Sequence, residues 1–172
     1  MQTVTNNPSL KKAFRDSLIY SGVMGTFIIV TMMWNAEIWL NDYPPDIKEK
    51  YGEPSPCTKR LSLIIAVPFF AVMIGGPIWS NHGLKQANGG HLTFKAAFLN
   101  AYALIISAWL FDLTILDWLL FVKKTPDFVV LPGTEGMAGY DDYGFHLKEH
   151  LRASPMLAGF VLMIAALTAS RP

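Results

Sequence analysis

Residues 109–121 read WLFDLTILDWLLF, an apolar run that contains two aspartates, Asp112 and Asp117. Crossing the hydrocarbon core of a bilayer, about 30 Å thick, takes about 20 mostly apolar helical residues. The apolar run extends back to Phe94, so residues 94–121 are long enough to cross a membrane. The two carboxylates are therefore expected inside a transmembrane helix, where an ionisable group usually has a partner and a function.

Three more segments have the same character: residues 18–40, 61–79 and 153–170, the last with a start as early as Tyr143. Four such runs in one chain exceed what a soluble core could cover. None alternates as a membrane strand would, so each is expected to be a helix. The predicted fold is an all-α membrane protein, with residues 1–172 as a single integral membrane domain. It forms a four-helix transmembrane bundle with two longer loops on one side.

The composition supports this fold and excludes several classes of protein. The 172 residues are 52% hydrophobic and 16% charged, with a net charge of +1, whereas soluble domains are about 25% charged. The near-zero net charge offers no basic surface for nucleic acid. The single cysteine excludes an internal disulfide or a CxxC redox pair.

The sequence predicts a location in the cell membrane and, less directly, an orientation. The polar first 17 residues lack a small-residue cleavage site, so the first apolar segment is expected to be retained. The loops on the two sides carry similar numbers of basic residues. Lys11, Lys12 and Arg15 precede the first span, which favours cytoplasmic termini.

Polar residues gather at one end of the predicted bundle. Because alternate spans run in opposite directions, the end of the first span, the end of the third and the start of the fourth share one side of the membrane. The polar residues on that side are Asn35, Glu37, Asp112, Asp117, His146, Glu149 and His150, whereas Asn81, His82 and His91 fall on the other side. We expect a site formed by the first group.

Asp112 lies five residues before Asp117, or roughly 7.5 Å deeper in an α-helix. Five residues also turn a side chain by about 140°, so the two aspartates are expected to point in different directions. Asp112 is either a structural carboxylate, paired or protonated, or a proton carrier, metal ligand or cation site. The candidate ligand-binding residues are Asn35, Trp109 and Asp112.

The sequence HLKEH at 146–150 has the form H-x-x-E-H. On a helix the two histidines lie on one face, a spacing that can hold zinc. The candidate metal ligands are His146, Asp117, Glu149 and His150, a set that suits zinc, iron or manganese. The alternative is that these are polar residues of the membrane interface.

The loop at 131–145, LPGTEGMAGYDDYGF, mixes turn residues with aromatic ones. It is expected to be ordered, to pack with the first loop, and to serve either as a well-turned connection or as a lid.

The motifs NDYPPDI (41–47), LDWLLF (116–121), PGTEGM (132–137) and YDDYGFHLK (140–148) resemble an uncharacterised family of small four-pass prokaryotic integral membrane proteins. The resemblance covers most of the chain and implies a multi-pass fold and a shared site, but no activity. It includes His146 and stops before the end of HLKEH. It therefore favours Asp117 and His146 over His150.

Two hypotheses for the function follow. The first is a protein that binds or moves a small ligand, ion or proton through the polar cluster, or serves as a subunit of a membrane complex. The second is a membrane-embedded, metal-dependent or metal-free enzyme for a lipid-soluble substrate, with Asp112, Asp117 and Glu37 as candidate catalytic residues. The expected partners are the lipid bilayer and either a second copy or a partner membrane subunit, with no nucleic acid.

Overall fold

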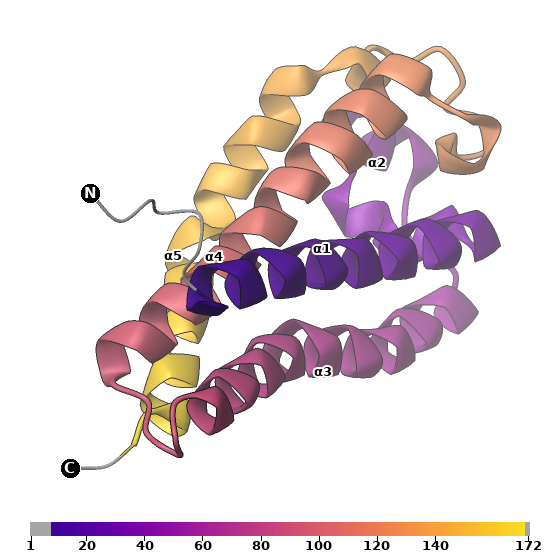
Figure 1. The fold of residues 1–172 in the computed structure, drawn as a ribbon. Coiled ribbons are helices and arrows are strands. Elements are labelled where there is room, and N and C mark those ends of the chain that lie inside the picture. Colours follow the sequence, from indigo (N-terminus) through magenta and orange to yellow (C-terminus); the bar gives the residue numbers. More distant parts are fainter. Residues whose placement is uncertain (1–7, 171–172) are drawn as a thin grey trace. The chain divides into compact units, whose positions relative to one another are not determined.

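The computed structural model describes residues 8–170 as an all-α four-helix bundle without strands in that range (Figure 1). Its elements are α1 (Pro8–Trp34), η2 (Ala36–Asp42), α2 (Pro45–Tyr51), α3 (Pro56–Ala87), α4 (Phe94–Phe111), η3 (Asp112–Lys124), η4 (Asp127–Val129), η5 (Ala138–Asp141) and α5 (Tyr143–Thr168). The predicted fold class is confirmed.

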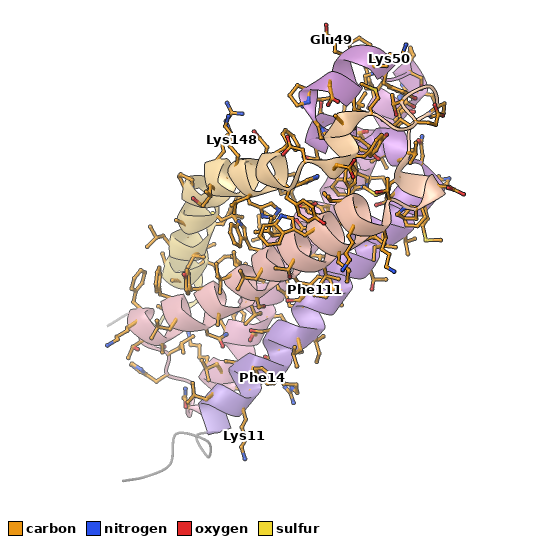
Figure 2. All side chains as sticks on the ribbon, turned by 90° about the horizontal axis from the view of Figure 1, so that it is seen from above. Lys11, Phe14, Glu49, Lys50, Phe111 and Lys148 are labelled. Carbon is orange, nitrogen blue, oxygen red and sulfur yellow. The ribbon has the colours of Figure 1, made fainter. Side chains whose placement is uncertain are left out.

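Among the described residues, four helical segments are long and apolar enough to cross a membrane: Leu10–Trp34, Pro56–Ala87, Phe94–Lys124 and Tyr143–Thr168. Many large apolar side chains on them point outward, such as Phe14 on α1, which is 68% exposed (Figure 2). Apolar side chains on the outside of a helix of this length fit a lipid environment.

The predicted bounds of the first two spans were wrong, and local hydrogen bonds account for the end of the first span and the start of the fourth. The first helix ends at Trp34, not at residue 40, because Asn35 adopts an extended backbone and its side chain accepts a hydrogen bond from the Glu37 N–H. The fourth begins at Tyr143, the earlier of the two starts that the sequence allowed, where the Asp142 carboxylate accepts a hydrogen bond from the Phe145 N–H at 2.9 Å.

The second helix is also longer than the predicted 61–79. It begins at Pro56, where the Ser55 hydroxyl oxygen accepts a hydrogen bond from the Thr58 N–H at 3.1 Å. It continues as one helix through Pro68 and Pro77 to Ala87.

The chain forms two compact units, and each long helix contributes to both. Unit 1 contains residues 1–24, 70–109 and 153–172, of which 8–24, 70–109 and 153–170 are described, and unit 2 contains residues 25–69 and 110–152. All seven residues predicted to share one side of the membrane lie in unit 2, whereas Asn81, His82 and His91 lie in unit 1.

Unit 1 is held together by apolar contacts between α3, α4 and α5, and by a close approach of α1 to α3. Buried Ala101, Ile105, Val161 and Ile164 form one apolar cluster. The ring of Tyr20 lies against Gly76, and its hydroxyl donates to the Met73 carbonyl at 2.9 Å. A Cβ on residue 76 would lie 2.7 Å from the Tyr20 ring, so this packing requires glycine.

The core of unit 2 is an aromatic and aliphatic cluster made by Leu40, Tyr43, Ile47, Phe121, Val122, Val129, Leu131 and Tyr140. The first loop (41–60) and the third loop (122–151) pack together here, as predicted. The Tyr43 hydroxyl donates to the Val129 carbonyl at 2.8 Å, and the Gly139 N–H donates to the Asp46 carboxylate at 2.9 Å.

Gly76→Ala should lower the thermal stability of the purified protein, because the Tyr20 ring is buried and its hydroxyl is bonded, so neither can move aside easily. Overpacking of this kind costs about 1–3 kcal/mol. Gly75→Ala is the matched control, since a Cβ there meets nothing within 4 Å. Equal melting temperatures for the two variants would contradict the packing described.

Candidate functional site

Asp112 begins a π-helix that continues the third span to Lys124. In a π-helix each N–H bonds to the carbonyl five residues earlier, which brings residues five apart towards the same side. At its end the Thr125 N–H donates to the Leu120 carbonyl at 3.0 Å, and Thr125 has a left-handed backbone with φ of 41°. The prediction that Asp112 and Asp117 point in different directions was therefore wrong, because it assumed α-helical winding.

Both aspartates face histidines of α5 within unit 2. The Nε2 atom of His150 lies 2.9 Å from Oδ2 of Asp117 and 3.6 Å from Oδ2 of Asp112. The Nδ1 atom of His146 lies 3.3 Å from the other oxygen of Asp117. We call these four residues the carboxylate–histidine cluster. Asp117 is its centre, because it contacts both rings.

Exposure is highest at one end of the cluster and lowest at the other. The side chain of Asp112 is 37% exposed, that of Asp117 20%, that of His150 13% and that of His146 6%. The cluster therefore has one accessible end at Asp112 and one buried end at His146.

Several contacts fix the start of α5, from which both histidines project. Trp118 of η3 donates from its indole N–H to the Tyr143 carbonyl at 3.3 Å, and the two rings are 6.0 Å apart. The His146 ring packs against Phe121 and Phe145, with ring centroids 4.9 and 5.3 Å away. Residues four apart share a helix face, so His150 follows His146 towards the aspartates.

The cluster also acts electrostatically on Asp42, a residue of η2. The negative charges of Asp117 and Glu149 repel that of Asp42 on η2, and the positive charge of Lys48 on α2 attracts it. The pKa of Asp42 is raised to about 6, first because protein atoms surround it and then because Asp117 repels its charge. Its side chain also reaches solvent, which screens the effect.

The predicted metal site is not supported by this geometry. Within residues 8–170 no group of three or more His, Cys, Asp or Glu side chains is arranged to hold a metal ion. Glu149 pairs with Arg152 at 3.2 Å, whereas His146 and His150 face Asp117.

The structure gives Glu37 and Asn35 a structural task. The Glu37 carboxylate accepts hydrogen bonds from the Ser55 N–H at 2.7 Å and from the Thr58 hydroxyl, at the start of α3. Asn35 begins η2 and donates to the Thr58 hydroxyl oxygen at 3.3 Å. Trp109 was predicted to bind a ligand together with Asn35 and Asp112. It is half-buried and belongs to unit 1.

Unit 1 contains a buried polar network that begins at Asp16, a residue only 2% exposed. Its carboxylate accepts hydrogen bonds from Lys12, from Arg15 at 2.9 Å and from the Ser80 hydroxyl at 2.7 Å. Because its charge is paired and hydrogen-bonded, Asp16 is tolerated in this interior.

The network continues through two asparagines. The Asn100 side chain donates to the Ser80 hydroxyl and to the Asn81 side-chain carbonyl, each at 2.9 Å. Asn81 in turn donates to the Thr168 hydroxyl at 2.8 Å and to the Ala97 carbonyl at 3.1 Å. The network therefore connects α1, α3, α4 and α5 within unit 1.

The sequence reasoning missed Asp16, Ser80 and Thr168 in this network. Asp16 was treated as part of a polar leader, because the first helix was predicted to start at residue 18. An earlier start would have put its carboxylate inside a span, which is the signal for a buried partner.

No protein-family model, no curated protein and no solved structure matches this chain. The resemblance to small four-pass prokaryotic membrane proteins therefore stays a prediction.

Glu37→Gln should destabilise the protein at neutral pH and have little effect in acid. Partial burial opposes the charge of Glu37, but the hydrogen bonds from Thr58 and Ser55 outweigh it and lower the pKa of the carboxyl. A carboxyl group whose pKa is lowered by folding stabilises the folded protein at pH values above its ordinary pKa, about 4.3. This stabilisation is lost as the pH falls through the pKa of the folded state. An anionic cap of this kind is worth about 0.5–2 kcal/mol.

Melting curves of the wild type and of Glu37→Gln, taken from neutral to acidic pH, measure this difference. Glu49→Gln is the control, since Glu49 is exposed on α2 and points away from the fold, as do Lys50 and Lys148 (Figure 2). If the difference in melting temperature between the wild type and Glu37→Gln stayed constant in acid, Glu37 would not act as an anionic cap.

Proposed function

We propose that the protein is a multi-pass membrane protein that binds and moves protons through the carboxylate–histidine cluster. One observation carries the proposal. The two oxygens of Asp117 face two different histidines, and one of these histidines also faces Asp112. Four titratable side chains thus form an unbroken series, with neighbours no more than 3.6 Å apart.

The chemistry of the four groups suits proton transfer. Imidazole can take up a proton on one nitrogen and release one from the other, and it changes charge near physiological pH. An ionised carboxylate between two such rings can accept a proton from either of them. Rotation of the Asp117 carboxyl group then presents that proton to the other histidine. The gap of 3.6 Å to Asp112 exceeds a hydrogen bond, so transfer there needs a small side-chain movement or a water.

The position of the series in the chain also favours this function. Ionisable residues inside spans usually mark proton relays, ion paths or ligand counter-ions. Asp42, outside the spans, is exposed, interacts electrostatically with Asp117 and has a pKa raised to about 6. It is therefore suited to exchange protons between the cluster and water near neutral pH.

Other functions predicted from the sequence have less support. A role as a subunit of a larger complex, or as a binder of another ion or ligand, is compatible with the cluster but needs further components. The enzyme hypothesis lacks an identified substrate. Metal binding is left out of the proposal, because Glu149 is engaged with Arg152 and the histidines with Asp117.

We also propose that the protein lies in the cell membrane with both termini in the cytoplasm. The basic residues Lys11, Lys12 and Arg15 at the start of the first span favour this orientation. Four spans then put the loop before α3 outside the cytoplasm.

Proteoliposomes that contain a pH-sensitive dye test proton movement. Under an imposed membrane potential the wild type should acidify or alkalise the lumen in the direction of the driving force. Asp117→Asn should abolish the flux, because the amide cannot take up a proton between the two rings. Glu149→Gln is the control and should keep the flux, since Glu149 is directed to Arg152.

His150→Gln is a second test of the same series, in case Asp117→Asn does not fold. A cooperative melting transition shows that each variant is folded. Wild-type protein without flux, or full flux in both variants, would overturn the proposal.

The native cysteine tests the orientation. Cys57 is exposed at the start of α3 and is the single cysteine of the chain. With cytoplasmic termini, a membrane-impermeant maleimide should label it in intact cells. In a Cys57→Ser background, His91→Cys in the next loop should react only after permeabilisation. The reverse pattern would contradict the orientation.

A further inference from the structure

The buried end of the carboxylate–histidine cluster has an unused hydrogen-bonding atom. Nε2 of His146 has no hydrogen-bond partner within residues 8–170, although the side chain is only 6% exposed. A buried polar atom without a partner costs stability, so native structures nearly always provide one, from protein or from another molecule.

The contact with Asp117 decides what kind of partner is needed. Nδ1 of His146 lies 3.3 Å from the Asp117 carboxylate. An ionised carboxylate only accepts hydrogen bonds, so Nδ1 carries the hydrogen of the neutral ring. Nε2 then keeps its lone pair and accepts a hydrogen bond. The missing partner is a donor.

The neighbouring side chains do not supply that donor. The rings of Phe121 and Phe145 pack edgewise against the imidazole, at interplanar angles of 66° and 79°. Two tyrosines pack against Phe121, but both phenols are already engaged. The Tyr43 hydroxyl donates to the Val129 carbonyl, and the Tyr140 hydroxyl bonds to the Leu131 N–H and to Thr134.

We infer that Nε2 of His146 is a binding site for an O–H donor from outside the chain. The shared chemistry is a neutral hydroxyl, supplied either by a buried water or by the hydroxyl of a lipid-soluble alcohol. The apolar rings on both sides favour a neutral donor over a charged one. Nε2 stands at the end of the series Asp112, His150, Asp117, His146.

The inference rests on the proposed function for its role, though not for its geometry. With water as the donor, the water gives its hydrogen to the lone pair of Nε2 while it takes up another proton on its other side, so it remains a neutral water. The Nδ1 proton of His146 then moves to the Asp117 carboxylate. The site is thus the point where protons enter or leave the buried end of the cluster.

Nuclear magnetic resonance of the full chain in lipid nanodiscs, with ¹⁵N-labelled histidine, tests the site. The chain has four histidines, so the ring signals can be assigned with single variants. We expect Nε2 of His146 to be unprotonated and hydrogen-bonded, with a cross-peak to an exchangeable O–H hydrogen. A bare lone pair without a cross-peak, or a hydrogen on Nε2 with none on Nδ1, would overturn the inference.

Two control variants keep the test interpretable. His146→Phe should remove the cross-peak, and His150→Phe should keep it, because His150 is directed to the aspartates. Loss of the cross-peak in a folded His150→Phe variant would show that the signal comes from His150 and not from His146, and would overturn the inference.

The source of the hydroxyl is resolved by delipidation, with farnesol as the probe alcohol. A cross-peak that survives delipidation identifies water. One that disappears and returns with farnesol identifies a lipid-soluble alcohol. A cross-peak that disappears and does not return would overturn the inference. The result of this experiment does not depend on proton transport. A bound donor without proton flux refutes only the proposed function. Proton flux without a bound donor refutes only the binding site at Nε2 of His146.

Discussion

The candidate site depends on the winding of one helix. Between Asp112 and Lys124 the backbone bonds each N–H to the carbonyl five residues earlier. Such π-helical segments are rare, usually a single turn, and frequent at functional sites. Here the winding turns Asp112 towards the same histidine that Asp117 contacts. With α-helical winding the two carboxylates would diverge by about 140°, and the series of four titratable groups would be broken.

Packing and hydrogen bonds within unit 2 hold that arrangement in place. Phe121 lies in the aromatic core with Tyr43 and Tyr140 and also packs against the His146 ring. The start of α5 is fixed by its Asp142 cap and by Trp118. Burial of this apolar core therefore stabilises both the fold of unit 2 and the position of the histidine most deeply buried in the cluster.

The sequence was sufficient for the coarse fold and for the membership of the site. Four apolar runs predicted four spans, and span direction alone assembled Asp112, Asp117, His146 and His150. The side-chain directions could not be predicted, because hydropathy does not distinguish α-helical from π-helical winding. Glu37 and Glu149 were included for their charge, yet hydrogen bonds to α3 and to Arg152 occupy them. Asp16 was overlooked because hydropathy placed the start of the first helix at residue 18, whereas α1 begins at Pro8.

The central claim is that Asp112 and Asp117 both face His150, and an internuclear distance measures it directly. Solid-state magnetic resonance of protein in lipid, with ¹⁵N in histidine and ¹³C in the aspartate carboxyl groups, detects contacts between Nε2 of His150 and each carboxyl carbon. Asp112→Asn and Asp117→Asn variants assign the two contributions. The account predicts that both carboxyl carbons contact the same nitrogen. Contact with Asp117 alone would mean α-helical winding in this segment and would contradict the account.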